Sequence, residues 1–294
     1  MCGIAGIFLK KPALEPELGS MLAKMLAVLS DRGPDSAGFA VYGNGHDGRI
    51  KITLRLLDET DPVDRLEKEF GGLDAVRRSN HVILSVPEQH FSCLNAAIVR
   101  LGTGVEFVGS GSRMELYKEV GLPSAVADRF DLAGMSGTHA IGHTRMATES
   151  AVTTKGAHPF STGLDQCLVH NGSLSNHNAV RRELKREGLT FATENDSEVA
   201  AGYLTWRMGE GATLKEALAH SLSDLDGFYT FVVGTESGFA VLRDPIACKP
   251  AVMAETDDFV AFGSEYRALA ELPGIAQARV FEPEPAVVYA WERH

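Results

Sequence analysis

This 294-residue chain has only four cysteines, and no two of them form a CxxC pair. They lie far apart, at Cys2, Cys93, Cys167 and Cys248. Structural zinc sites and thioredoxin-type redox sites need closely spaced cysteines, so the sequence disfavours both kinds of site. Isolated cysteines also suit a reducing compartment, and we expect a cytoplasmic protein without a metal site.

Long apolar runs and an excess of basic residues are missing as well. No stretch approaches the roughly 18 apolar residues of a membrane-spanning helix, and the apolar stretch after Cys2 is too short for a signal peptide. The chain has 28 lysines and arginines against 39 acidic residues, a net charge of −11. This balance argues against a surface that follows nucleic-acid phosphates. We therefore expect neither a membrane nor a nucleic acid as a partner.

Motifs for the common cofactors are also absent. The sequence contains no Gly-rich phosphate loop, no dinucleotide-binding fingerprint and no cysteine set for an iron–sulfur cluster. We therefore expect no cofactor. The length is sufficient to bury a full core, either as one large domain or as two ordinary ones.

The most informative residue is Cys2, which directly follows the initiator Met1. Ordinary methionine removal would expose an α-amine beside a thiol. An α-amine titrates at about 7.7–8.0, so it can serve a neighbouring thiol as a general base near neutral pH. A nucleophile with its own base needs no separate histidine. A merely small residue after a removed methionine gives the same pattern, so the catalytic interpretation requires an oxyanion hole and substrate-binding groups elsewhere.

The segment after Cys2 predicts a buried strand, then a helix over 14–30 and a turn that leads into a strand at 39–42. The turn contains Arg32 between Asp31 and Asp35, with two glycines nearby. These charges either cap the helix and the turn or form a polar wall around a small polar substrate. We therefore include Arg32 among the candidate substrate-binding residues.

Residues 138–148 predict a strand on which His139, His143 and Arg145 share one face. A planar guanidinium matches a carboxylate with two hydrogen bonds, which makes Arg145 a candidate for binding a substrate α-carboxylate. The two histidines would be roughly 13 Å apart along a strand, too far to share a metal. We expect them to be hydrogen-bonded core residues.

A second informative strand, 167–170, is predicted to end in Asn171 and Gly172. An amide followed by glycine at a strand end is either an ordinary turn or an oxyanion hole, built from the side-chain NH₂ and the glycine backbone N–H. Helices over 177–187 and 199–208 follow. In front of the second helix, Asp196 is either part of the helix cap or a ligand for a substrate ammonium group.

The segment 44–134 carries no recognisable chemistry. It predicts strands at 50–57 and 81–86, a helix at 63–70 and two helical turns within 116–130. Within it, Cys93 is expected to be a small buried apolar residue rather than a reactive thiol.

Taken together, six short motifs resemble those of the class II glutamine amidotransferases, the glutaminase family with an N-terminal cysteine. They occur in the family's order and cover residues 1–43 and 136–265. Any one of them is weak evidence, whereas six in order are specific. The motifs are Met1-Cys2-Gly3-Ile4, Arg32-Gly33-Pro34-Asp35-Ser36-Ala37-Gly38, His143-Thr144-Arg145, His170-Asn171-Gly172, Asn195-Asp196-Ser197-Glu198 and Arg243-Asp244-Pro245.

This resemblance implies an α+β fold, the four-layer αββα sandwich of N-terminal nucleophile hydrolases, as a single type-2 amidotransferase domain over 2–294. It implies that Cys2 is the nucleophile and forms a thioester, and that Asn171 and Gly172 form the oxyanion hole. It also implies that Arg145 binds the α-carboxylate of glutamine and Asp196 its α-amine. The segment 44–134 is longer than the family pattern, so we treat it as an insertion atypical of the family.

Residues 139–265 most resemble stand-alone amidotransferase subunits of glutamate-synthase-like complexes, notably the A subunit of N-methylglutamate synthase. The resemblance implies hydrolysis of L-glutamine to L-glutamate and ammonia, with delivery of ammonia to a separate synthase subunit. Two alternatives remain open. One is a non-catalytic, glutamine-binding regulatory subunit, which would predict a damaged nucleophile or substrate site. The other is an amidohydrolase of the same fold that acts on another amide, which an arginine–aspartate pair suited to an α-amino acid disfavours.

Overall fold

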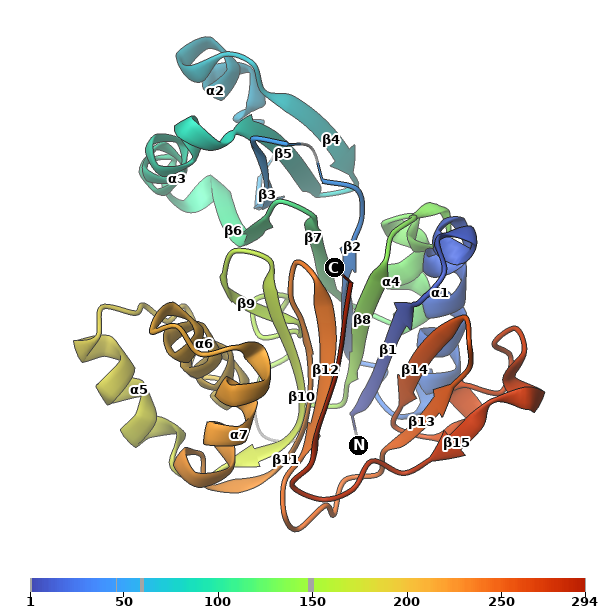
Figure 1. Cartoon of the computed structure of the whole chain (residues 1–294). Helices are drawn as coiled ribbons and strands as arrows, with labels where there is room; N and C mark the ends of the chain where they lie inside the picture. The colour runs from blue at the N-terminus through green and yellow to red at the C-terminus, as the bar shows by residue number, and fades with distance from the viewer. Residues whose placement is uncertain (1, 46, 59–60, 148–150, 294) are drawn as a thin grey trace.

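The computed structural model describes residues 2–45, 47–58, 61–147 and 151–293, and its strands form three antiparallel sheets (Figure 1). The seven-stranded sheet has the order β15 (Arg279–Phe281), β13 (Val252–Glu255), β14 (Phe259–Gly263), β1 (Gly3–Leu9), β8 (His139–Arg145), β2 (Ser36–Tyr42), β7 (Met114–Val120). The five-stranded sheet has the order β16 (Val288–Glu292), β12 (Gly238–Arg243), β11 (Gly227–Gly234), β10 (Gln166–Leu174), β9 (Phe160–Gly163). The small sheet has the order β4 (Asp74–Arg78), β5 (His81–Pro87), β3 (Arg49–Leu56), β6 (Val105–Gly111).

Strand β1 shows why the two large sheets pack face to face. Side chains alternate between the faces of a strand. Ile4 and Phe8 enter the core between the sheets, where they meet Val232 of β11. Ile7 and Leu9 point the other way, into the core beneath the first helix. Every residue of β1 is buried, with β14 and β8 paired on either side, so the start of the chain is held rigidly.

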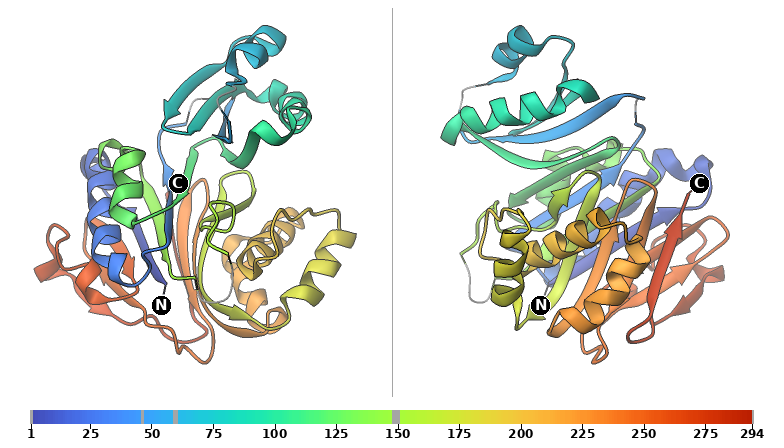
Figure 2. Two further views of the ribbon diagram at one scale, coloured as in Figure 1. Left: turned by 180° about the vertical axis from the view of Figure 1, so that it is seen from behind. Right: turned by 60° about the vertical axis from the view of Figure 1, so that its left-hand side comes forward.

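Helices cover the outer faces of both large sheets (Figure 2). On the seven-stranded sheet these are α1 (Leu18–Val28) and α4 (Pro123–Arg129). On the five-stranded sheet they are α5 (His177–Arg186), α6 (Asp196–Gly209) and α7 (Leu214–Asp224). The layers run helix, sheet, sheet, helix, which confirms the predicted αββα sandwich. Within the described ranges, no helix is both long and apolar enough to cross a membrane.

The segment 44–134 divides into two parts. Strands β3 to β6 form the small sheet, and α2 (Val63–Phe70) and α3 (Phe91–Arg100) pack on it to form a unit with a hydrophobic core of its own. This unit stands at one end of the sandwich (Figure 1). The last part belongs to the sandwich, because β7 pairs with β2 and α4 packs against α1.

The two helical turns expected within 116–130 are present as α4, but the structure adds strand β7 before them. The strand was missed because Glu115, Lys118 and Glu119 are typical of an exposed helix rather than of a largely buried strand. The expectation for Cys93 needs correction. Cys93 is exposed. Helix α3 turns Leu94 and its i+3 and i+4 neighbours toward the small sheet, which leaves Cys93 on the outer face.

Candidate active site

Cys2 directly precedes β1 and is partly exposed, so its thiol is within reach of a substrate. Its Sγ lies 3.8 Å from the carbonyl oxygen of Met146, just beyond β8. Two hydrogen bonds anchor the strand behind it: Ile4 N–H donates to Ser264 Oγ at 2.8 Å, and Ser264 N–H donates to Ile4 O at 3.0 Å. Met1, whose removal the prediction of an N-terminal nucleophile requires, lies outside the described residues.

Two side chains converge on the backbone carbonyl of Cys2. Asn171 Nδ2 donates to this oxygen at 3.2 Å from the five-stranded sheet. Arg32 Nε donates to the same oxygen at 3.2 Å from the turn after α1. The structure therefore brings together three of the residues that the sequence singles out, from segments far apart in the chain.

Asn171 and Gly172 lie within a strand and not in a turn. Strand β10 continues to Leu174 because β11 pairs with it along this length, with Asn171 opposite Thr230 and Gly172 opposite Tyr229. The prediction that the strand ends at residue 170 is therefore wrong.

The backbone at Gly172 tolerates no side chain. A Cβ there would lie 2.0 Å from the carbonyl oxygen of Phe228 and 2.8 Å from Nε2 of His170, and its φ of 155° is one that other residues rarely adopt. The glycine keeps this side of Asn171 free of a side chain.

Arg145 ends β8 with a side chain that is almost entirely buried. Its Nη1 donates to the carbonyl of Ala151 at 3.4 Å. The turn that contains Arg32 is fastened to this strand end: Asp35 N–H donates to Arg145 O at 3.1 Å, and Asp35 Oδ2 accepts from Ala147 N–H at 2.7 Å. A Cβ on Gly33 would lie 2.5 Å from Arg145 N, so this close approach requires glycine.

Arg32 bridges Cys2 and Glu265. Its Nη1 lies 3.5 Å from Glu265 Oε2, while Nε contacts Cys2. Its Nη2 is buried and has no hydrogen-bond partner within the described part of the chain. Sequence reasoning gave no role to Glu265, because nothing local marks a residue that meets its partner more than 230 positions away.

Asp196 is the first residue of α6, but it does not cap the helix. The cap is Asn195, whose side chain accepts from Ser197 N–H at 2.9 Å. Asp196 Oδ2 instead accepts from Leu174 N–H of β10 at 2.9 Å, and Oδ1 lies 3.8 Å from His170 Nδ1. The carboxylate therefore faces the strand that carries Asn171.

A cluster of three buried histidines lies behind this strand, and of these only His143 is predicted from the sequence to be a core residue. Ser197 Oγ is 2.8 Å from both His158 Nε2 and His170 Nδ1. His143 stacks on His158 at 4.0 Å, and its Nε2 is 3.1 Å from the carbonyl of His170. Burial lowers the pKa of all three rings, that of His143 to about 3. At neutral pH they are uncharged groups that orient β10 and the start of α6.

The prediction that His139 and His143 are hydrogen-bonded core residues is confirmed. His139 is fully buried, with Nδ1 2.9 Å from Thr138 Oγ1 and Nε2 2.8 Å from the carbonyl of Thr235. Its ring also stacks on Tyr42 at 4.0 Å.

The structure has the αββα sandwich of N-terminal nucleophile hydrolases, with Cys2 just before β1 and Asn171 on the opposite sheet. Two solved structures share this fold. The allosteric regulatory enzyme of purine biosynthesis matches with a TM-score of 0.66 and 22% identity, over 99% of this chain and 47% of that chain. The glutamine phosphoribosylpyrophosphate amidotransferase of B. subtilis matches with a TM-score of 0.62 and 21% identity, over 99% and 49%. This chain spans about half the length of each, and at these identities the likeness shows the fold alone.

Sequence comparison defines the family. A family model described as a glutamine amidotransferase domain matches residues 143–271. The chain is 56% identical over 296 residues to the glutamine amidotransferase-like protein GlxB of Rhizobium meliloti (strain 1021), covering 99% of this chain and 98% of the relative. The chain therefore belongs to the glutamine amidotransferase family, as a class II enzyme. Glutamine is the substrate that this membership implies.

Proposed function

We propose that the chain is a glutaminase subunit, which hydrolyses L-glutamine to L-glutamate and ammonia through a thioester on Cys2 and passes the ammonia to a separate synthase subunit. The observation that carries this proposal is the position of Cys2. The start of β1 is held in the sandwich core, and the side-chain amide of Asn171 lies 3.2 Å from the Cys2 carbonyl.

The proposed reaction uses groups of this chain alone. After removal of Met1, the α-amine of Cys2 accepts the thiol proton, and the thiolate attacks the carboxamide carbon of glutamine. The side-chain amide of Asn171 and the backbone N–H of Gly172 donate to the oxyanion that forms. The protonated α-amine then returns its proton to the leaving nitrogen, so that the C–N bond breaks and ammonia departs. Water hydrolyses the thioester, which yields glutamate and restores the thiol.

Three charged side chains would hold the amino-acid end of glutamine. Arg145 would bind the α-carboxylate, and Asp196 would bind the α-ammonium group. Arg32 has two roles in this proposal: Nε holds the Cys2 carbonyl, and Nη2, which has no partner among the described residues, remains for substrate. A buried donor without a partner is costly unless a ligand or water satisfies it.

The second part of the proposal is a separate subunit that accepts the ammonia. The sequence offers no second motif for an acceptor, and residues 139–265 resemble subunits of glutamate-synthase-like complexes, including N-methylglutamate synthase. We place the reaction in the cytoplasm because all four cysteines are free.

The test is glutamate release by the purified chain, alone and with any protein that co-purifies with it from the native host. We expect slow release by the chain alone, faster release with the partner, and none by Cys2→Ala. Full turnover without any partner would support a free-standing glutaminase. Preference for glutamine over N-acetylglutamine and simple amides separates this proposal from an amidohydrolase, and no hydrolysis in any preparation would support a glutamine-binding regulatory subunit.

A further inference from the structure

Strand β7 joins the small sheet to the active-site side of the sandwich. It is the edge strand of the seven-stranded sheet, and β2 separates it from β8. Across these strands, Ala37 pairs with Glu119 on one side and with Thr144 on the other. A strand spacing of about 4.8 Å therefore places Glu119 about 10 Å from the end of β8, where Arg145 lies.

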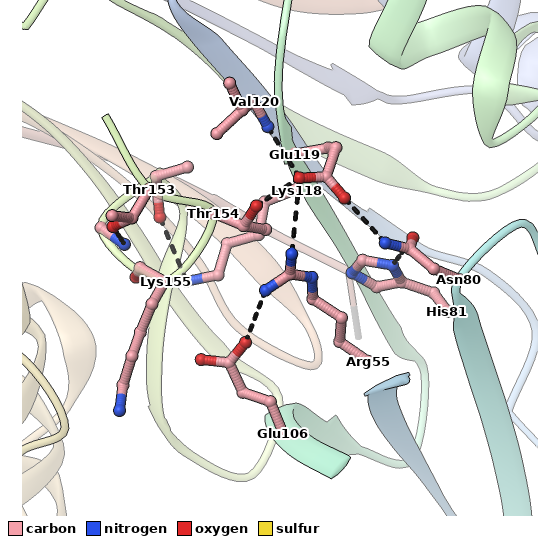
Figure 3. Close-up of polar contacts among 12 residues, drawn as sticks. Arg55, Asn80, His81, Glu106, Lys118, Glu119, Val120, Thr153, Thr154 and Lys155 are labelled. Atoms are coloured by element: carbon pink, nitrogen blue, oxygen red, sulfur yellow. Dashed lines mark hydrogen bonds and ion pairs between the residues drawn. The ribbon is translucent and has the colours of Figure 1, made fainter. Parts of the chain in front are cut away.

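The carboxylate of Glu119 is shared between the small sheet and residues 151–159, the segment that follows β8 (Figure 3). Thr154 Oγ1 donates to it from that segment. From the small-sheet unit, Asn80 Nδ2 in the turn between β4 and β5 donates at 2.7 Å, and Arg55 of β3 forms an ion pair at 3.7 Å. Arg129 of α4, in the sandwich, forms a second ion pair with Glu119 at 3.7 Å. Burial by itself would raise the pKa of Glu119, but hydrogen bonds from Thr154, Asn80 and the Val120 N–H hold it below the usual value. The residue, only 6% exposed, is therefore a charged acceptor with a full set of donors.

The two groups from the small sheet are themselves held in place. Arg55 Nη1 pairs with Glu106 Oε2 at 3.1 Å. Asn80 Oδ1 lies 2.9 Å from Nδ1 of His81, and the buried His81 ring packs edge-on against Phe130 at 4.7 Å. The small sheet thus presents a fixed guanidinium and a fixed amide to Glu119.

Lys118, next to Glu119 on β7, also binds the segment 151–159. Its buried Nζ donates to three backbone carbonyls, which uses all three of its N–H groups. The acceptors are the carbonyls of Lys155 (3.3 Å), Ala157 (3.1 Å) and Pro159 (3.5 Å). A Cβ on Gly38 would lie 2.3 Å from the carbonyl oxygen of His158, so a glycine in β2 allows the segment to cross the sheet here.

The segment 151–159 lies beside the guanidinium of Arg145 at two points. Arg145 Nη1 donates to the carbonyl of Ala151 at 3.4 Å, and a Cβ on Gly156 would lie 3.6 Å from the same nitrogen. A hydrogen bond of 3.1 Å from Ala157 N–H to the Thr154 carbonyl closes a turn that contains Gly156. This turn connects Thr154 to Gly156, which lies beside the Arg145 guanidinium.

We propose that Glu119 is a positioning residue of the glutamine site. Through Arg55 and Asn80 on one side and Thr154 on the other, the small sheet sets the position of residues 151–159 against Arg145 and thereby the affinity for glutamine. The inference rests on the proposed function, in which Arg145 binds the α-carboxylate. It gives the small sheet a part in substrate binding.

The test is a double-mutant cycle on the full chain with Arg55→Met and Thr154→Val, which remove one contact on each side of Glu119. Each single variant should raise KM for glutamine about threefold to thirtyfold, the range of coupling through such networks. We expect kcat to stay within about twofold, because the effect is on substrate binding. The double variant should be no worse than the weaker-binding single one, since both act through one carboxylate.

Two further variants complete the design. Asn80→Ala is a second, independent change on the small-sheet side and should behave like Arg55→Met. Arg100→Met is the matched control, because Arg100 lies on α3 with a side chain that is 64% exposed and forms an ion pair with Glu69 of the same unit. It should leave KM and kcat at the wild-type values.

A second measurement, the rate of Cys2 alkylation, distinguishes a specific effect on glutamine binding from a general disturbance of the active site. The rate of Cys2 alkylation is followed in its peptide by mass spectrometry, with a diazoketone analogue of glutamine and with iodoacetamide. The variants should react more slowly with the analogue by the factor seen in KM and at an unchanged rate with iodoacetamide, with the exposed Cys93 and Cys248 as internal references. Unchanged KM in the single variants, additive effects in the double variant, or equal slowing by both reagents would overturn the inference. Failure of the analogue to label Cys2 in the wild type would instead contradict the proposed function.

Discussion

The side-chain amide of Asn171 donates a hydrogen bond of 3.2 Å to the backbone carbonyl of Cys2, across the interface between the two large sheets. The two residues are 169 positions apart. Cys2 directly precedes β1 and Asn171 lies on β10, and the inner faces of these two strands share one core. Packing of the sandwich therefore sets the distance between the proposed nucleophile and the proposed oxyanion donor.

Asn171→Ala should lower kcat by about 10²–10³-fold with little change in KM, because an oxyanion donor acts mainly in the transition state. Steady-state glutamate release measures both constants. Asn178→Ala, on the exposed face of α5, is the matched control and should retain full activity. An Asn171→Ala enzyme with wild-type kcat would remove this residue from the oxyanion hole.

Changes to the two proposed substrate-binding residues, Arg145 and Asp196, should raise KM rather than lower kcat. Arg145→Ala and Asp196→Asn each remove a charge-assisted contact worth about 1.5–3 kcal/mol, so KM for glutamine should rise by about 10- to 150-fold. Asparagine is chosen at 196 because its amide oxygen still accepts from the Leu174 N–H. If the two variants lowered kcat and left KM unchanged, these residues would act in the chemical step and not in substrate binding.

Acid should destabilise the fold well above the range in which carboxylates titrate. Burial lowers the pKa of His81, His139 and His143 to about 3, from an ordinary value near 6.5. Between about pH 6.5 and 3 the unfolded chain binds more protons than the folded one, so stability falls as the pH is lowered, by up to about 1.4 kcal/mol per pH unit for each ring. Above this window the three rings contribute no pH dependence.

Urea unfolding between about pH 7 and pH 5 measures this loss. His81→Phe tests one ring, because phenylalanine fits beside Tyr117 and Phe130 without a titrating group. Its unfolding free energy should depend less steeply on pH than that of the wild type. An identical slope in both proteins would show that His81 is not neutral in the fold.

The sequence was sufficient for the sandwich and for the order of its motifs. Alternation of apolar residues predicts β1, and the six motifs imply the αββα layers that the structure contains. The local sequence pattern gave a wrong prediction where a strand's length depends on pairing with a strand distant in the sequence. The sequence predicts a strand end at Asn171 and Gly172 because polar and glycine residues usually end strands, but pairing with β11 continues β10 through them.

The same limit applies to the residues around the site. Nothing near Glu265 in the sequence indicates its contact with Arg32, and nothing near Ser197 indicates two histidine partners. Lys118 and Glu119 have the composition of a solvated surface, although both are buried in the fold. Such residues become recognisable only when tertiary contacts are known, because charge pairing across sheets has no local periodicity.

The central claim is that Cys2, with a free α-amine, is the nucleophile. The direct measurement is intact-mass and peptide analysis after reaction with the diazoketone analogue of glutamine. We predict that Met1 is absent, that one equivalent is bound at Cys2 in proportion to the loss of glutaminase activity, and that Cys2→Ala is inert. The buried Cys167 and the exposed Cys93 and Cys248 should remain unmodified. Modification at Cys93 or Cys248 together with an active Cys2→Ala enzyme would contradict the account.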